Sequence, residues 1–351
     1  MRHLVFFPTL LLSLGTLGAQ SNWQAQVSGT TARLRGVSAV TERVAWASGS
    51  GGTVVRTIDG GATWEVRPVP GASALDFRDV EAFDAKTAYV LAIGAGDKSR
   101  IYKTTDGGGT WVLQFTNADP KAFYDAVAFW DAKTGMAMGD PVDGRFQIVR
   151  TLDGGKTWLP VPPDGMPPAL PGEGAFAASG TCLVAAGKTL AWFGTGGAEK
   201  ARVFRTNDQG RTWTVVNTPL TAGAASAGVF SVAFSGGADG VVVGGDFRKE
   251  RESGDNVALS SDGGRSWTFP GAARLRGFRS AVVFVPGTRW NSLIAVGPAG
   301  VARTDDGGRS WTPIGTAGSG GFHAVAVDPV GRVAWAVGEG GSIAKLAITP
   351  R

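Results

Sequence analysis

The segment Thr57–Trp64 (TIDGGATW) indicates the fold, because its pattern recurs five more times along the chain. The shared pattern is Ser/Thr-x-Asp-x-Gly-x-Ser/Thr-Trp, and successive copies lie 44 to 55 residues apart. Each copy contributes one aspartate: Asp59, Asp106, Asp153, Asp208, Asp262 and Asp306. A motif that returns at a near-constant period of this length indicates a repeat architecture.

Each copy fits a hairpin turn between two strands. Thr53–Arg56 precedes the first copy with a strand-like pattern, and Trp64–Val66 begins another strand. The Asp side chain can accept hydrogen bonds from nearby backbone N–H groups, and Gly61 permits a positive φ. The tryptophan can cover the adjacent sheet. Six copies in one position favour a folding role for these carboxylates over a catalytic one.

Two more strands complete each repeat. An inner strand is flanked by aromatic or apolar residues six positions apart, as in Phe77–Phe83 and Phe123–Phe129. A second strand ends in glycine, as in residues 44–49 (VAWASG). A four-stranded antiparallel unit of about 45 residues is typical of a β-propeller blade.

The seventh blade is split between the two ends of the chain. Residues 322–346 supply three strands after the last turn, and no further turn follows. Residues 22–27 (NWQAQV) supply the missing strand and carry Trp23 at the tryptophan position of the repeat. We therefore predict an all-β fold, with residues 20–351 forming one seven-bladed β-propeller. The N-terminal strand closes the ring and leaves no bare sheet edge.

Composition narrows the possible functions. Glycine occupies 54 of 351 positions, about twice its usual share, as a turn-rich β fold requires. One cysteine and two histidines argue against a disulfide framework, a thiolate zinc cluster and a multi-histidine metal site. The net charge of +5 contains no long basic run, which argues against nucleic acid as a partner. We expect neither a metal nor a cofactor.

The first 19 residues have the pattern of a secretory signal peptide. A basic start precedes the apolar run Leu4–Leu17, and small residues follow at Gly18 and Ala19. The alternative is a membrane anchor, but the run is shorter than the roughly 18 apolar residues of a spanning helix, and Pro8 interrupts it. We expect an exported protein, periplasmic or secreted, without a membrane span after cleavage.

Loop lengths predict which face of the ring carries function. The aspartate and tryptophan of the motif are always five positions apart, whereas the connections on the opposite face vary in length. Variable loops are free to carry binding residues. Three unusual segments are expected on this face, opposite the motif turns: residues 139–146 (GDPVDGRF), the long loop 160–179, and the charged insertion 246–252 (DFRKERE).

One set of positions on this face stands out. The residue just after the start of each inner strand is expected, by repeat symmetry, to lie near the mouth of the channel. These residues are Arg35, Arg78, Tyr124, Ala177, Val229, Arg279 and His323, with Asp79, Asp125 and Arg145 nearby. Guanidinium groups bind carboxylates or phosphates through paired, charge-assisted hydrogen bonds. The alternative is that each arginine pairs with a neighbouring aspartate and only joins blades.

The chain resembles the neuraminidase-type Asp-box repeat superfamily and, within it, the photosystem II stability/assembly factor-like proteins. The resemblance rests on the six boxes, on the similar segments 44–49 (VAWASG) and 333–338 (VAWAVG), and on Phe77–Val80 (FRDV). It implies a non-enzymatic scaffold that binds a protein partner through one face. The arginines would then suit an acidic protein surface or an anionic glycan.

The competing hypothesis is a glycoside hydrolase or lyase of sialidase-like type. Such enzymes resemble this ring and use three arginines, a tyrosine and acidic residues. The candidate catalytic residues here are Tyr124, Asp140, Asp143 and Glu173. A glycosidase needs two carboxyl groups at a suitable separation. The Arg-Ile-Pro signature of sialidases is absent from the sequence.

Overall fold

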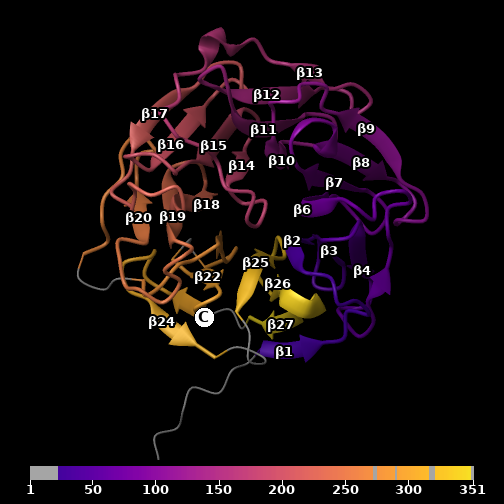
Figure 1. The fold of residues 1–351 in the computed structure, drawn as a ribbon. Coiled ribbons are helices and arrows are strands. Elements are labelled where there is room, and N and C mark those ends of the chain that lie inside the picture. The colour runs from indigo at the N-terminus through magenta and orange to yellow at the C-terminus, as the bar shows by residue number, and fades with distance from the viewer. Residues whose placement is uncertain (1–22, 272–274, 289–290, 316–320, 349–351) are drawn as a thin grey trace, which may run out of the picture.

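The structure, a computed structural model, describes residues 23–271, 275–288, 291–315 and 321–348. Seven antiparallel sheets are arranged in a ring around a central opening (Figure 1). The predicted seven-bladed β-propeller is therefore confirmed. The predicted signal peptide, residues 1–19, lies outside the described residues.

The first three blades each contain four strands, hydrogen-bonded in sequence order. Blade 1 contains β2 (Leu34–Ala39), β3 (Ala45–Gly49), β4 (Thr53–Thr57) and β5 (Glu65–Val66). Blade 2 contains β6 (Asp76–Ala82), β7 (Ala88–Ile93), β8 (Arg100–Thr104) and β9 (Val112–Thr116), with the 3-10 helix η1 (Gly96–Lys98) before β8. Blade 3 contains β10 (Tyr124–Phe129), β11 (Gly135–Val142), β12 (Arg145–Thr151) and β13 (Leu159–Pro160).

The next three blades continue around the ring. Blade 4 follows the 3-10 helix η2 (Pro163–Gly165) and contains β14 (Leu183–Ala186), β15 (Leu190–Gly194), β16 (Arg202–Thr206) and β17 (Thr214–Asn217). Blade 5 contains β18 (Ala227–Ser235), β19 (Asp239–Asp246) and β20 (Val257–Ser260). Blade 6 contains β21 (Ala281–Phe284), β22 (Leu293–Gly297), β23 (Gly300–Thr304) and β24 (Thr312–Ile314).

The seventh blade joins the two ends of the chain, as predicted. It contains β25 (Phe322–Val327), β26 (Val333–Gly338), the 3-10 helix η3 (Glu339–Gly341), β27 (Ile343–Ala347) and β1 (Trp23–Gln26). Strand β1 pairs antiparallel with β27 and places Trp23 opposite Leu346. The Trp23 ring is buried and packs on Phe322, with the ring centroids 5.6 Å apart. The first described strand therefore closes the ring at this blade (Figure 1).

Blade 5 departs from the expected four strands. After β20, the chain pairs again at one position, where Leu259 and Thr268 exchange two backbone hydrogen bonds of 2.9 Å. The next hydrogen-bonded pair in this register would join Val257 and Pro270. Because proline has no N–H group, this pair cannot form in full, and the outer strand is reduced to a single bridge.

The six motif turns share one hydrogen-bonding arrangement. In the first, the Thr57 hydroxyl donates to one Asp59 carboxylate oxygen at 2.9 Å, and the Thr63 N–H donates to the same oxygen at 2.9 Å. The Thr63 hydroxyl donates to the other oxygen at 2.7 Å. These bonds, those from Thr63 first, lower the pKa of Asp59 to about 2. The equivalent bonds are present in all six turns.

Large aromatic side chains fill the layers between blades. Trp46, Trp192 and Trp335 stand on the second strands of their blades and are fully buried. Most tryptophans at the motif position are buried as well: Trp23, Trp64, Trp158, Trp213 and Trp267. Within the described ranges, no helix has the length and apolar character needed to cross a membrane.

Candidate functional site

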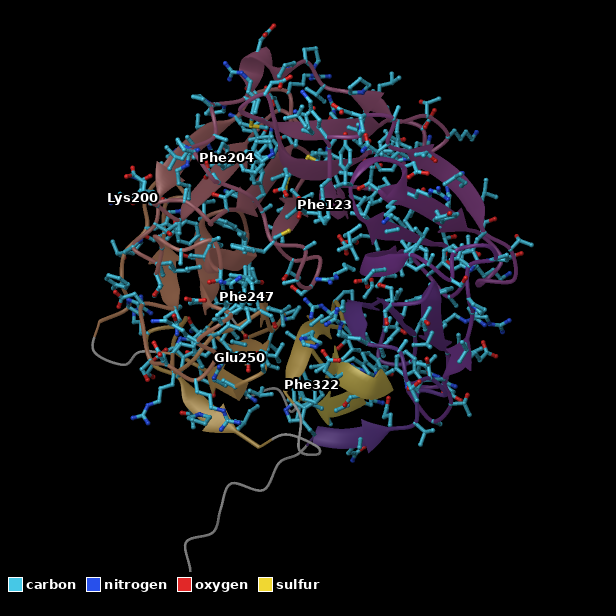
Figure 2. All side chains as sticks on the ribbon, in the orientation of Figure 1. Phe123, Lys200, Phe204, Phe247, Glu250 and Phe322 are labelled. Carbon is cyan, nitrogen blue, oxygen red and sulfur yellow. The ribbon has the colours of Figure 1, made fainter. Side chains whose placement is uncertain are left out.

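A central pocket of about 570 Å³ lies where the inner strands begin. Its walls come from the starts of the inner strands and from the connections between second and third strands, on the face opposite the motif turns. The polar residues that line it are Arg33, Arg35, Arg78, Asp125, Asp140, Glu250, Ser280, His323 and Glu339. Its aromatic residues are Phe123, Phe176, Phe230, Phe247 and Phe278. In Figure 2, Phe123 and Phe247 lie at the inner rim of the ring, on different sides of the opening.

A repeated β-bulge directs side chains into the central pocket. In five blades, the register between the first and second strands shifts by one residue near the start of the inner strand. The extra residue of each bulge lines the central pocket: Arg35, Arg78, Asp125, Phe230 and His323. A bulge bends its strand and redirects a side chain, which explains why these five residues converge.

This register corrects the set of equivalent positions expected from the sequence. Tyr124 and Val229 stand one residue before the bulge, paired with Gly139 and Gly244 of their second strands, and both are buried in the layers between blades. Arg279 is likewise buried, and Ser280 lines the pocket in its place. Ala177 does line the pocket, but it lies six residues before β14 begins.

Arg35 is a cation without a counter-charge in direct contact. In the part of the chain that the structure describes, its guanidinium makes no hydrogen bond and no ion pair, and its buried Nε atom has no partner. Burial, together with the positive charges of Arg78 and Arg33, lowers the pKa of Arg35 to about 10. The group therefore remains charged at neutral pH, in a site where water only partly solvates it.

The neighbouring cations are held by contacts within the ring. Arg78 donates from Nε to an Asp76 carboxylate oxygen at 2.9 Å and from Nη1 to the Ala177 carbonyl oxygen at 3.0 Å. Arg33 lies 3.8 Å from Glu339, across blades 1 and 7. Arg78 is thus bound to an aspartate of its own strand and to the Ala177 carbonyl oxygen, whereas Arg35 has no such partner among the described residues.

His323 is neutral at physiological pH. Its Nε2 atom lies 2.7 Å from a Glu339 carboxylate oxygen. Burial, followed by the charge of Arg35, lowers the pKa of His323 to about 4 despite this contact. The positive charge of the central pocket therefore comes from its arginines.

Three aspartates stand on blades 2 and 3, close to Arg78: Asp79, Asp125 and Asp140. Asp79 does not line the pocket: one carboxylate oxygen accepts the Val127 N–H at 2.8 Å, and burial raises the pKa to about 7. Burial raises the pKa of Asp140 to about 6. For Asp125, burial and the nearby Asp140 raise the pKa well above its usual value. Burial therefore favours the neutral form of each of these carboxyl groups.

Residues 174–182, which we call the channel loop, line the central pocket through residues 175–178. Phe176 stacks on Phe230 with ring centroids 3.8 Å apart and an interplanar angle of 9°. The Ser179 hydroxyl donates to the Ser280 carbonyl oxygen at 2.9 Å, which links the loop to blade 6. Figure 1 shows a loop beside β14 that reaches into the central opening. The length of this loop is visible in the sequence, but its position in the opening is not.

The other candidate catalytic residues lie outside the central pocket. The Glu173 side chain is fully buried, where it accepts hydrogen bonds from Arg202 Nε at 2.8 Å and from the Thr195 hydroxyl at 2.6 Å. Tyr124 packs on Phe115, and burial raises its pKa to about 12. Asp143 is exposed at a turn, 3.7 Å from Lys121. Of the four candidates, Asp140 alone lines the pocket.

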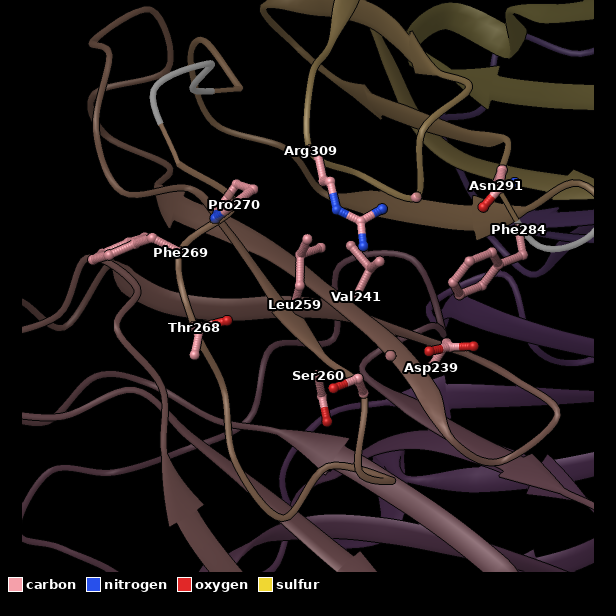
Figure 3. Close-up of a pocket in the computed structure, with 13 residues that line it drawn as sticks. Asp239, Val241, Leu259, Ser260, Thr268, Phe269, Pro270, Phe284, Asn291 and Arg309 are labelled. Atoms are coloured by element: carbon pink, nitrogen blue, oxygen red, sulfur yellow. The ribbon is translucent and has the colours of Figure 1, made fainter.

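Two further features lie away from the central pocket. Arg145 donates to the Met166 carbonyl oxygen and does not line the pocket. A second cavity of about 310 Å³ lies between blades 5 and 6, next to the single bridge at Thr268. Figure 3 shows Leu259, Phe269 and Arg309 around it. No group of three or more metal-ligating side chains occurs within the ranges described.

The fold and the pocket define a β-propeller with a central, partly cationic pocket on one face. No protein-family model matches the chain, and no curated protein matches it. Among solved structures, "YCF48 bound to D1 peptide" is similar at a TM-score of 0.65 and 19% identity, covering 93% of this chain and 97% of that one.

Two more solved structures are similar over most of their length. YCF48 from Cyanidioschyzon merolae has a TM-score of 0.58 and 16% identity, covering 94% of this chain and 99% of that one. The Neurospora crassa Pan2 WD40 domain has a TM-score of 0.62 and 13% identity, covering 91% and 90%. At these identities the comparisons establish the propeller fold.

Proposed function

We propose that this chain is a non-enzymatic binding propeller that holds an acidic group of a protein partner in the central pocket. The observation that carries the proposal is the unpaired Arg35 guanidinium, directed into the pocket by a bulge and flanked by Arg33 and Arg78. A planar guanidinium that lacks an internal partner can form paired, charge-assisted hydrogen bonds with a carboxylate.

The structural neighbours support a protein as the partner. Two of them are YCF48 structures, and one of these two is bound to D1 peptide. We carry over from them the class of ligand and a role resembling that of an assembly factor.

We also assign the six turns to the neuraminidase-type Asp-box repeat, on the basis of their common hydrogen bonds.

We extend the proposal to the compartment on the basis of the N-terminal sequence pattern. With residues 1–19 as a cleaved leader, the partner is a periplasmic or secreted protein, or the exported segment of a membrane protein.

The hydrolase hypothesis has less support. Of its four candidate catalytic residues, Tyr124, Asp143 and Glu173 lie outside the central pocket, and Asp140 alone lines it.

The test compares Arg35→Gln with Arg43→Gln in purified residues 20–351. Arg43 is exposed in the β2–β3 connection, on the face of the motif turns, so both variants lose one positive charge. The probes are dye-labelled peptides with capped ends and one central Glu, matched peptides with Gln, and an oligogalacturonate. Fluorescence anisotropy measures the dissociation constants.

We expect the Glu peptides to bind more tightly than the Gln peptides, and Arg35→Gln to weaken their binding about tenfold or more, since a hydrogen bond to a charged group contributes ~1.5–3 kcal/mol. Arg43→Gln should bind as the wild type does. Equal binding of Glu and Gln peptides would refute the proposal. Preference for the oligogalacturonate over every peptide would replace the protein partner with a glycan.

A further inference from the structure

The central pocket has two chemically different sides. The cations come from blades 1 and 2, namely Arg33, Arg35 and Arg78. The aromatic cluster comes from blades 5 and 6 and from the channel loop: Phe176, Phe230, Phe247 and Phe278. Around the ring, blade 7 separates blade 1 from blade 6, and blades 3 and 4 separate blade 2 from blade 5 (Figure 1). A ligand that fills the pocket therefore meets the arginines of blades 1 and 2 and the aromatic cluster of blades 5 and 6, and it also meets Asp125 and Asp140 of blade 3.

The aromatic cluster is built around Phe230. Phe176 stacks on this ring at 3.8 Å, Phe278 meets it edge-on at 4.6 Å, and Phe247 lies 6.1 Å away. Phe230 and Phe278 are buried, which makes their positions rigid. The Phe247 side chain is 42% exposed. An exposed aromatic ring on a preformed apolar wall is a typical contact for a ligand side chain.

The distribution of acidic residues narrows the ligand further. Glu339 is engaged by His323 and Arg33 on the cationic side. Glu250 is exposed beside the aromatic cluster, and its carbonyl oxygen accepts the Phe278 N–H at 2.9 Å. A second ligand carboxylate would therefore approach the Glu250 charge, whereas an apolar group would not. Like charges brought together at an interface oppose binding.

We infer that the central pocket recognises one carboxylate placed directly beside a bulky apolar side chain, and that it discriminates against a run of acidic residues. The carboxylate pairs with Arg35, and the apolar side chain packs on Phe247. This inference rests on the proposed function, because it specifies the ligand of the same pocket. The pocket volume of about 570 Å³ lies within the usual range of roughly 300–1,000 Å³ for ligand sites.

The test uses dye-labelled hexapeptides with capped ends and four central pairs: Glu-Phe, Gln-Phe, Glu-Gly and Glu-Glu. A fifth peptide ends in Phe with a free carboxyl group and contains no acidic side chain. This peptide separates a chain-end carboxylate from a side-chain carboxylate. Anisotropy is measured with the wild type, Phe247→Ala, Arg35→Gln and the control Leu159→Ala. Leu159 is a 66% exposed apolar residue of β13 that does not line the central pocket.

We expect Glu-Phe, or the free-end peptide, to bind roughly tenfold more tightly than Glu-Gly, because burial of an aromatic side chain contributes at least this factor. Phe247→Ala should remove the preference for Phe while keeping the preference for Glu over Gln. Leu159→Ala should change neither. Glu-Glu should bind no more tightly than Glu-Gly.

Other outcomes separate the two proposals. Equal binding of Glu-Phe and Glu-Gly, with both weakened by Arg35→Gln, would overturn this inference and leave the proposed function intact. Equal binding of Glu-Phe and Gln-Phe together with no tighter binding of the free-end peptide, or no binding by any peptide, would overturn both. If Phe247→Ala fails to fold, Phe247→Leu provides the second variant, with a smaller expected loss of the Phe preference.

Discussion

Arg78 donates a 3.0 Å hydrogen bond to the carbonyl oxygen of Ala177, 99 positions further along the chain. This bond joins the bulge of blade 2 to the channel loop, so two parts of the pocket wall that are far apart in the sequence are held together. Asp76 fixes the same guanidinium from the other side at 2.9 Å. Arg78 is therefore both a positioned charge and a structural link, whereas Arg35 has no such second role.

We predict that Arg35→Gln makes the fold no less stable and raises its free energy of unfolding by on the order of 1 kcal/mol. The guanidinium is largely buried, lies near Arg78 and Arg33, and has no partner among the described residues. Its removal relieves desolvation and repulsion. Urea unfolding of the wild type and the variant at pH 7 measures the difference. A clear loss of stability would show that Arg35 is a structural residue.

Trp23→Ala should destabilise the protein by about 3–5 kcal/mol, because it removes a large buried side chain from the strand that closes the ring. Val27→Ala serves as the control, since Val27 is 87% exposed just after the same strand. It should change stability by no more than about 0.5 kcal/mol. Thermal unfolding followed by tryptophan fluorescence compares the two. Similar midpoints for both variants would contradict the role assigned to β1.

Asp79→Asn should stabilise the protein increasingly as the pH rises from 5 to 8. The folded-state pKa of Asp79 is raised to about 7, mainly by burial, above the usual value of 3.8. The folded protein therefore binds this proton more tightly than the unfolded chain, and stability is lost as the pH rises through the folded-state pKa. Asparagine stays neutral and can still accept the Val127 N–H.

The loss accumulates between the unfolded-state pKa of 3.8 and the folded-state pKa of about 7, so the gain of Asp79→Asn at pH 8 should exceed its gain at pH 5 by about 2 kcal/mol. Urea titrations at pH 5, 6, 7 and 8 provide the measurement. The exposed aspartate of a motif turn offers a contrast: the pKa of Asp106 is lowered to about 2 by hydrogen bonds, first of all from Thr110. It therefore stays ionised over this range. A gap between Asp79→Asn and the wild type that does not change with pH would disprove the pKa argument.

The sequence is sufficient to predict the ring because each repeat is defined by residues that lie close together in the sequence. Each turn needs an acceptor carboxylate, a glycine and a tryptophan at fixed offsets, so six copies are recognisable without tertiary information. Trp23 reveals the closing strand for the same reason. The short outer strand of blade 5 depends on Pro270, whose effect follows from a cross-strand register that the sequence alone does not display.

The central pocket is harder to predict because it depends on non-local geometry. A bulge adds one residue to a strand, and no fixed sequence pattern marks it. In blades 3 and 5 the residue that lines the pocket is therefore one position later than the residue expected from the repeat. Tyr124 thus falls in the core, and Asp125 lines the pocket. The aromatic cluster joins Phe176 in a loop to Phe230 in a strand, and no repeat relates these two residues.

The most direct measurement is a crystal structure of the mature protein with the capped Glu-Phe hexapeptide. We predict a peptide carboxylate oxygen at roughly 2.7–3.2 Å from the guanidinium nitrogens of Arg35, with the Phe ring against Phe247. A peptide bound on the face of the motif turns, or a central pocket in which the carboxylate lies away from Arg35, would contradict the account.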